Sequence, residues 1–174
     1  RNAPEGFKKA IDNANKLDAD FVLTGGDMIA DALGARGSQA DSLYSLYAEL
    51  EKQLDKPVYH TIGNHELLGI YSASGVDKGH PDYDDGMYKR YFGNPYYSFD
   101  HKGWHFIVLK SMVDAGNKYI GYIDEEQVEW LKKDLEETDP ATPIIISTHI
   151  PFISTYGQLV KGALAPNDEA LIVN

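Results

Sequence analysis

Residues 61–66 read Thr-Ile-Gly-Asn-His-Glu and follow the short apolar run 57–60. Such a run is typical of a buried strand in a parallel sheet, so the polar residues after it stand at the strand's carboxyl end. In open α/β sheets that end is where ligand sites form. A single Asn-His pair is most simply a polar turn. However, the β-rich stretches 21–27 and 144–149 also end on potential metal ligands, an aspartate and a histidine. Three strands with ligand-type residues at their ends indicate one shared site.

Helical periodicity precedes each of these strands. Apolar residues recur at helical spacing in 7–17 and in 38–54, and each predicted helix leads into a strand. A third helix is predicted from 124 to about 138, where Asp124 can cap the first turn and Gln127 can reach back to the cap. The first two helix-strand units in a row point to a parallel sheet. We predict that Asp27, Asn64 and His149 converge at the carboxyl-terminal edge of one parallel sheet, because all three end β-rich runs.

The middle of the chain has a different pattern. Residues 96–100 and 104–109 predict two strands of a hairpin that turns at Lys102-Gly103, with both faces of the hairpin largely buried. A short helix is predicted at 86–92, and the start of another at 167–173. The sequence has no internal repeat and no domain linker, which predicts that these elements belong to a single domain.

The composition fits a soluble globular protein. With 174 residues, of which 43% are hydrophobic and 25% charged, the chain is long enough for one domain with a sizeable core. The formal charge of −11 argues against a nucleic-acid groove, whose affinity depends on Lys and Arg side chains at phosphates. There is no cysteine, so any metal must use oxygen and nitrogen ligands. No apolar run approaches the ~18 residues of a transmembrane segment. No targeting segment identifies the compartment, and we lean towards a secreted or periplasmic location.

The residues at the three strand ends resemble those of the calcineurin-like metallophosphoesterase family. The matching blocks are Gly26-Asp27, Gly63-Asn64-His65-Glu66 and Thr148-His149, in the family's order and each after a strand. The resemblance implies an α/β fold in which two mixed sheets, flanked by helices, form an α/β/β/α sandwich. The hairpin would belong to the second of these sheets.

Two of the family's five blocks have no counterpart in the sequence. An Asp-x-His pair would precede Phe7, and a Gly-His-x-His block would follow Asn174. We therefore expect residues 1–174 to be a single truncated catalytic domain with an incomplete sandwich. The absent first strand would leave the strand 21–24 with an exposed edge, through which an oligomer could form.

The resemblance implies hydrolysis of a small phosphate ester, as a phosphatase or phosphodiesterase, by a water that two divalent ions activate. Asp27, Asn64 and His149 would be metal ligands: a carboxylate that can bridge two ions, a neutral amide oxygen and a neutral imidazole nitrogen. Mn, Fe, Zn and Mg all suit such donors. Because two ligand blocks are absent, we expect at most one ion in this piece, and little or no activity from it alone.

His65 and Glu66 would have other roles. The resemblance implies that His65 protonates the leaving oxygen or stabilises its charge, and that Glu66 orients His65 or a metal ligand. The alternative is a non-catalytic binding or scaffold module that keeps the fold and part of the site. The intact Asp27, Asn64 and His149 favour the enzyme, because a site that has lost its function more often carries substitutions within its remaining blocks.

Overall fold

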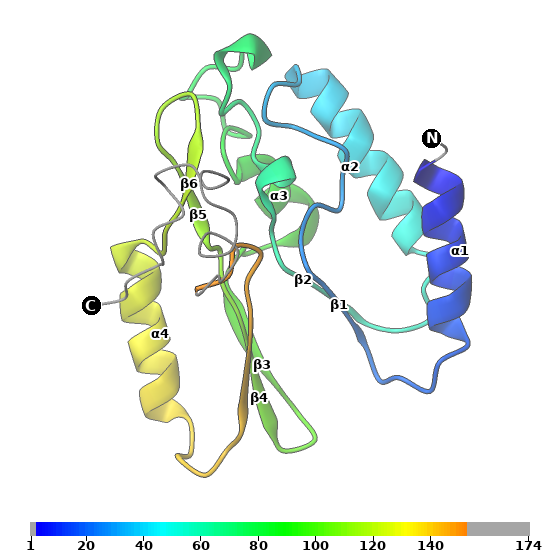
Figure 1. Cartoon of the computed structure of the whole chain (residues 1–174), viewed down its shortest axis with the longest axis vertical. Helices are drawn as coiled ribbons and strands as arrows, with labels where there is room; N and C mark the ends of the chain where they lie inside the picture. The colour runs from blue at the N-terminus through cyan, green and yellow to red at the C-terminus, as the bar shows by residue number, and fades with distance from the viewer. Residues whose placement is uncertain (1–2, 153–174) are drawn as a thin grey trace, which may run out of the picture.

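The structure is a computed structural model, and it describes residues 3–152. In Figure 1 the helices 3–15 and 37–51 lie on one side of the molecule, the helix 125–137 lies on the other side, and the longer strands run between them. The helices are α1 (Ala3–Asn15), α2 (Gly37–Glu51), α3 (Gly86–Phe92) and α4 (Glu125–Glu137), with short 3₁₀ turns at Asn64–Glu66 and Ser72–Ser74. The strands are β1 (Val22–Thr24), β2 (Val58–His60), β3 (Tyr97–His101), β4 (Trp104–Val108), β5 (Met112–Asp114), β6 (Tyr119–Gly121) and β7 (Ile144–Ser147).

The strands of the described residues form three sheets. β1 and β2 pair in parallel, with Val22 opposite Val58. β3 and β4 form an antiparallel hairpin, and β7 adds to β4 in parallel. β5 and β6 make a small antiparallel pair. The α/β class is thereby confirmed. The prediction that the strands before Asp27, Asn64 and His149 share one parallel sheet is wrong for the described residues, because β7 joins the hairpin and not β1 and β2. The hairpin turns where the sequence predicted, because Lys102 and Gly103 have the positive φ angles, 47° and 80°, that its two-residue turn requires.

Aromatic side chains join the sheet β1–β2 to the sheet β3–β4–β7. Phe21, just before β1, makes edge-on contacts with Phe99 and Phe106, with ring centroids 5.5 and 5.3 Å apart. Tyr59 of β2 stacks on Phe99 at 3.6 Å, with the two rings inclined by 3°. Aromatic pairs contribute about 0.5–1.5 kcal/mol each beyond the area that they bury. One face of each of these two sheets therefore packs against the other sheet.

The helices cover the outer faces of these two sheets (Figure 1). On one side α1 packs on α2, where Phe7 stacks on the buried Tyr47 with ring centroids 5.0 Å apart. On the other side α4 covers the hairpin, and its Leu131 packs against the buried cluster of Ile107, Leu109 and Ile123. The layers follow the order helix, sheet, sheet, helix, which is the arrangement that the resemblance implied.

The helix boundaries differ from the sequence pattern in two places. α1 begins and ends earlier than residues 7–17, and Leu17, predicted on its buried face, is 64% exposed. α2 ends before residue 54, because the amides of Gln53 and Leu54 bond three residues back and tighten the chain into a 3₁₀ turn. α3 coincides with the short helix predicted at 86–92. The helix start predicted at 167–173 lies outside the described residues.

The predicted capping box of α4 is only half formed. Asp124 accepts the Gln127 N–H at 2.8 Å, as predicted. The side chain of Gln127, however, does not reach back to the cap. It is completely buried, and its amide accepts the Lys110 N–H at 2.8 Å and donates to the Lys110 carbonyl at 3.0 Å. The amide of Gln127 thus pairs with the backbone N–H and carbonyl of Lys110, as a neighbouring strand would. This pairing replaces the contact with the cap that the local pattern predicted.

Strand β7 is more exposed than its apolar sequence predicted. Ile144, Ile145 and Ile146 are 40%, 39% and 46% exposed, because in the described part of the chain β7 pairs with β4 alone and lies at the edge of its sheet. Trp104, at the start of β4, is 45% exposed, so the hairpin is not buried on both faces along its whole length. β1 likewise pairs with β2 alone among residues 3–152, and association through its other edge stays a prediction. No helix in this range is long and apolar enough to cross a membrane.

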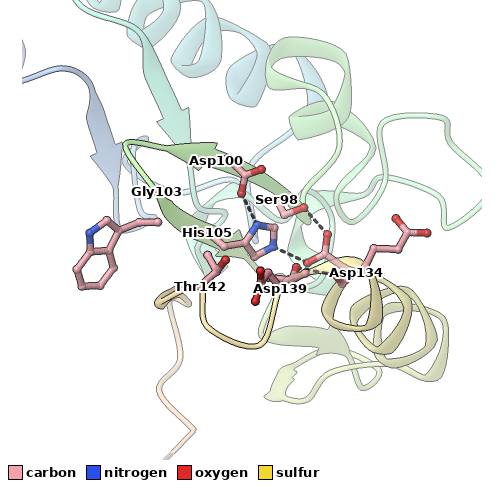
Figure 2. A pocket seen from close by; sticks show the side chains of 10 residues that line it. Ser98, Asp100, Gly103, His105, Asp134, Asp139 and Thr142 are labelled. Carbon is pink, nitrogen blue, oxygen red and sulfur yellow. Dashed lines mark hydrogen bonds and ion pairs between the residues drawn. The ribbon is translucent and has the colours of Figure 1, made fainter.

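His105 ties the hairpin to α4. Its Nδ1 lies 2.7 Å from Asp100 Oδ1 and its Nε2 lies 2.8 Å from Asp134 Oδ2 (Figure 2). Both carboxylates can only accept, so a ring that is protonated on both nitrogens satisfies both contacts. Burial lowers the pKa of His105, but the hydrogen bonds to Asp134 and Asp100 outweigh burial and raise the pKa overall. A cavity of about 570 Å³ opens beside the ring, with Glu137 and Asp139 adding negative charge to its wall.

We expect His105→Gln to lower stability more at pH 6 than at pH 9. The raised pKa means that the charged ring stabilises the fold fully below the unfolded pKa of about 6.5, and that this stabilisation is lost as the pH rises through the higher folded pKa. Glutamine can keep one hydrogen bond but carries no charge, so the free energy of unfolding at pH 6 should fall by about 1–3 kcal/mol. Urea unfolding of both proteins at the two pH values measures the difference. A loss that is the same at both values would contradict a charged ring.

Candidate metal centre

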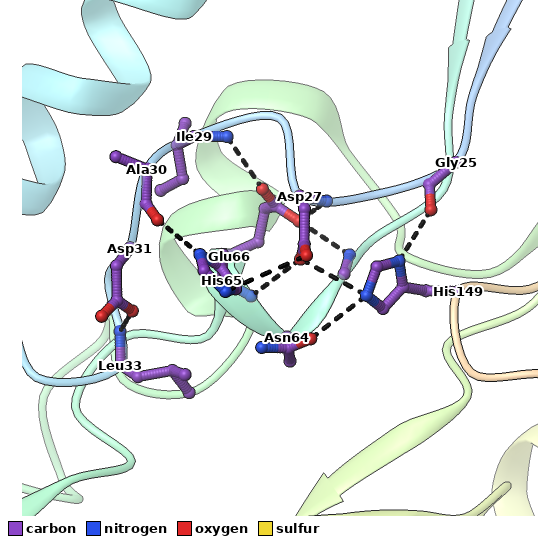
Figure 3. Close-up of polar contacts among 11 residues, drawn as sticks. Gly25, Asp27, Ile29, Ala30, Asp31, Leu33, Asn64, His65, Glu66 and His149 are labelled. Atoms are coloured by element: carbon purple, nitrogen blue, oxygen red, sulfur yellow. Dashed lines mark hydrogen bonds and ion pairs between the residues drawn. The ribbon is translucent and has the colours of Figure 1, made fainter. Parts of the chain in front are cut away.

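Two successive residues in the left-handed region turn the chain after β1. Gly26 has a φ of 91° and Asp27 a φ of 54°. Glycine adopts such a backbone freely, whereas for aspartate it is uncommon, and residues held in this way often cluster at functional sites. The turn directs the Asp27 side chain towards Asn64, His65 and His149 (Figure 3).

The turn after β1 packs against the turn after β2 with almost no side chain between them. A Cβ atom on Gly26 would lie 2.8 Å from the Gly63 Cα and 2.6 Å from His149 Nδ1. A Cβ on Gly63 would lie 2.4 Å from both the backbone nitrogen and Oδ1 of Asp27. Real side chains do not approach so closely, so both positions need glycine. The close contact between the two turns is what brings Asp27 to Asn64.

The three predicted metal ligands, Asp27, Asn64 and His149, lie close together beside these two turns (Figure 3). His149 Nε2 is 3.1 Å from Asn64 Oδ1 and 3.4 Å from Asp27 Oδ1. Two donors that bind one ion at about 2.0–2.2 Å are themselves roughly 3.0–3.5 Å apart in octahedral or tetrahedral geometry. The observed separations therefore suit ligands of a single ion.

The hydrogen bonds around His149 leave three lone pairs facing one another. Nδ1 lies 2.8 Å from the Gly25 carbonyl oxygen, which can only accept, so in the neutral ring Nδ1 carries the proton and Nε2 does not. The Nε2 lone pair then faces the amide oxygen of Asn64 and the carboxylate of Asp27. In the neutral ring these three acceptors repel one another, and either a second proton on the ring or a cation between the three groups would remove the repulsion. This donor set fits a divalent metal ion.

The donor set mixes three chemical types. Residues 3–152 contain no group of three or more His, Asp and Glu side chains that could hold one ion. The predicted site has two such side chains, and the neutral amide of Asn64 would be its third donor. Carboxylate, amide and imidazole donors together suit Mn, Fe, Zn and Mg. The assignment of Asp27, Asn64 and His149 as ligands remains a prediction.

His65 lies beside these three residues and presents one ring nitrogen to them. Its Nδ1 donates to the Ala30 carbonyl, which leaves Nε2 directed towards Asp27, 3.9 Å from Oδ2. Its backbone N–H donates to Asp27 Oδ1 at 3.2 Å. The side chain is 39% exposed. The ring thus stands at the rim of the site with one nitrogen free to hold a proton.

Glu66 holds the two turns together. It is completely buried, and its carboxylate accepts three backbone N–H groups, from Gly63 at 2.7 Å, Asp27 at 2.8 Å and Ile29 at 3.1 Å. Burial raises the pKa of Glu66, and the three N–H groups offset part of that rise. We expected Glu66 to orient His65 or a metal ligand. Within the described residues none of its hydrogen bonds reaches the ring of His65, and it acts on Asp27 through the backbone.

Three supporting groups were not recognised from the sequence. One is the Gly25 carbonyl, and another is the Tyr44 hydroxyl of α2, which donates to the Glu66 carbonyl at 2.6 Å. The third is a pair of hydroxyls, those of Thr61 and Ser147, which lie 2.6 Å apart. The sequence did contain a signal for this pair, because a Thr or Ser stands two or three positions before each predicted ligand. The other two groups had none, because a carbonyl and a tyrosine on a distant helix carry no local pattern.

An apolar groove adjoins Asp27. It has a volume of about 430 Å³ and lies between α1, α2 and the turn after β1. Its apolar lining includes Phe7, Met28, Ile29, Leu43, Leu46 and Tyr47. An organic group bound beside the metal ligands would meet hydrocarbon on this side.

Glu66→Gln should destabilise the protein. Glutamine has one acceptor oxygen, so its NH₂ group would face at least one of the three backbone donors in a buried space. An unpaired buried donor costs about 1–3 kcal/mol, and the free energy of unfolding should fall by that amount. Urea unfolding checks this, with the exposed Glu125→Gln in α4 as the matched control. Equal stability of the two variants would mean that Glu66 does not hold the turns.

Comparison with known proteins identifies the family of the chain. A family model described as calcineurin-like phosphoesterase matches residues 3–172. Purple acid phosphatase 23 of Arabidopsis thaliana is 42% identical to the chain over 67 residues, which are 37% of this chain and 13% of that protein. The matched region is thus a small part of the relative's length. The family model, in contrast, covers almost the whole chain, including the turns that carry Asp27, Asn64 and His149. The chain therefore belongs to the calcineurin-like phosphoesterase family.

Proposed function

We propose that the complete protein is a metal-dependent phosphoric ester hydrolase whose metal centre includes Asp27, Asn64 and His149. Membership of the family supports hydrolysis of phosphate esters, and the similarity to a purple acid phosphatase supports the same reaction class. One observation carries the assignment of the centre. In the neutral tautomer with its proton on Nδ1, His149 Nε2 faces two oxygen acceptors at 3.1 and 3.4 Å, an arrangement that a divalent cation would stabilise.

When bound, divalent ions supply Lewis acidity, which makes water a nucleophile near neutral pH and offsets the charge of a phosphate group. Asp27 has two carboxylate oxygens, so it can serve a second ion besides the one that it would share with Asn64 and His149; a two-ion centre is part of the proposal. Asn64 adds an oxygen donor without adding negative charge. This matters in a chain with a formal charge of −11, because further negative charge at the site would repel the substrate.

His65 is the proposed proton donor to the leaving oxygen. Its Nδ1 is occupied by the Ala30 carbonyl, so a proton on Nε2 faces the site. The partial exposure of the ring lets a phosphate ester approach this nitrogen. Imidazole is the side chain most often used for proton transfer near neutral pH. Glu66 would keep Asp27 and the turn after β2 in register while the ester binds.

The apolar groove beside Asp27 supports a substrate with an apolar ester group. A phosphate held near Asp27 could direct such a group between α1 and α2 without burying an unpaired polar atom. Aryl esters are therefore suitable probes. Comparing p-nitrophenyl phosphate with bis(p-nitrophenyl) phosphate distinguishes a phosphatase from a phosphodiesterase.

Asp27→Ala should abolish both metal binding and hydrolysis in the complete protein, because it removes the carboxylate from the donor set. Elemental analysis after equilibration with Mn²⁺ gives the metal content, and release of p-nitrophenol gives the activity. The nearby Asp31→Ala is the matched control, since Asp31 accepts the Leu33 N–H at 2.8 Å and is outside the donor set. A normal metal content in Asp27→Ala would refute the proposed centre.

His65→Ala should keep the metal and lose turnover. Removing a positioned acid typically costs ~10²–10⁴-fold in rate, because the leaving oxygen must depart without a proton. The same two assays measure both quantities. Loss of metal in this variant would make His65 a ligand and not a proton donor. If the wild-type protein binds metal but hydrolyses neither ester, the non-catalytic binding module becomes the better explanation.

A further inference from the structure

The candidate metal centre is divided between two sheets. Asp27 and Asn64 follow β1 and β2, whereas His149 follows β7. Within residues 3–152, β2 pairs with β1 and β7 pairs with β4, and no backbone ladder joins β2 to β7. The distance between His149 and the other two residues therefore depends on contacts between side chains and turns.

Two hydroxyl groups meet at the boundary between these sheets. Thr61 Oγ1 and Ser147 Oγ lie 2.6 Å apart, which is a short hydrogen bond between hydroxyls. Thr61 stands three residues before Asn64, and Ser147 stands two residues before His149. Thr61 is completely buried. The pair thus connects the ends of β2 and β7, two or three residues before the predicted ligands.

Each hydroxyl belongs to a residue whose backbone is fixed in its own sheet. The Thr61 N–H donates to the Thr24 carbonyl at 3.3 Å, which extends the pairing of β2 with β1. The Leu109 N–H donates to the Ser147 carbonyl at 3.0 Å, which extends the pairing of β4 with β7. A shift of one sheet against the other would therefore stretch the hydroxyl contact together with the spacing of the ligands.

We infer that Thr61 and Ser147 are a positioning pair, which sets the separation of His149 from Asn64 and Asp27 for a divalent cation. The inference rests on the proposed function of the site. A metal ion tolerates changes in ligand distance of only about 0.2 Å, so a small relaxation between the sheets is enough to weaken binding. Neither residue is a ligand; the pair acts through the backbone of the two strand ends.

The hydroxyls of Thr61 and Ser147 differ in exposure, and this decides which substitution disturbs the stability of the protein less. Ser147 is only half-buried, so after Thr61→Val its hydroxyl can find water, and valine has nearly the shape of threonine. Ser147→Ala instead leaves the buried Thr61 hydroxyl without its partner. Both variants should weaken metal binding, but Ser147→Ala should cost more stability.

The test is calorimetric titration of the complete protein with Mn²⁺, together with the visible spectrum of bound Co²⁺, which reports ligand geometry. Thr61→Val should raise the Kd for Mn²⁺ about tenfold, at the lower end of what changes behind metal ligands cost, and should shift the Co²⁺ bands. Thr61→Ser keeps the hydroxyl and should bind like the wild type. The matched control is Thr138→Val, which makes the same exchange at the C-cap of α4, where the Thr138 hydroxyl donates to the Asp134 carbonyl at 2.8 Å.

The double variant Thr61→Val with Ser147→Ala should have about the same Kd for Mn²⁺ as whichever single variant has the higher Kd. The reason is that the two substitutions remove the same interaction. A wild-type Kd and an unshifted Co²⁺ spectrum in Thr61→Val and Ser147→Ala would overturn the positioning role and leave the proposed function standing. An equal loss in Thr138→Val would assign the effect to general destabilisation and also overturn it. A wild-type protein that binds no Mn²⁺ would overturn both the proposed function and this inference.

Discussion

The buried carboxylate of Glu66 is the contact on which the site depends. A buried carboxylate is costly unless it is hydrogen-bonded, and this one accepts three backbone N–H groups from two different turns. Those turns meet at Gly26 and Gly63, where any Cβ atom would collide with the other turn. The carboxylate and the two glycines are therefore parts of one arrangement. The glycines permit the close approach, the carboxylate holds it, and Asp27 and Asn64 come together as a result.

The second half of the site depends on how the two sheets are stacked. Phe21, Tyr59 and Phe99 fill the space between the layers and keep the sheets in register across their faces. At the edge of β2, the Tyr97 hydroxyl accepts the His60 N–H at 2.8 Å and donates to its carbonyl at 3.1 Å, so one side chain from the other sheet serves both backbone groups. His149 is thus carried to the site by the layer that contains the hairpin. Its distance from Asn64 reports how the layers fit, so the hydroxyls at their boundary would affect the binding of a metal ion.

The electrostatics of the candidate site fit the proposal that an acidic protein acts on an anion. The chain has a formal charge of −11, and Asp27 adds negative charge where a phosphate would bind. Cations at that point would reverse the local field, since they are the largest charges in a site of this kind. The donors suit this role because the amide and the imidazole are neutral and only one carboxylate is among them. A wholly acidic donor set would bind cations as well but would leave less net positive charge for the substrate.

The sequence by itself determined which residues stand at the ends of the strands, the α/β class, the hairpin turn and the cap at Asp124. All of these follow from periodicity or from short-range residue patterns, which are local properties of the chain. Only the tertiary structure decided that Glu66 holds Asp27 through its backbone, that Gln127 pairs with Lys110, and that Thr61 meets Ser147. It also decided that Ile144, Ile145 and Ile146 are partly exposed, in a strand that pairs with β4 alone among residues 3–152. A side chain's hydrogen-bond partner and a strand's place in its sheet depend on segments far away along the chain, and no local pattern specifies which segments those are.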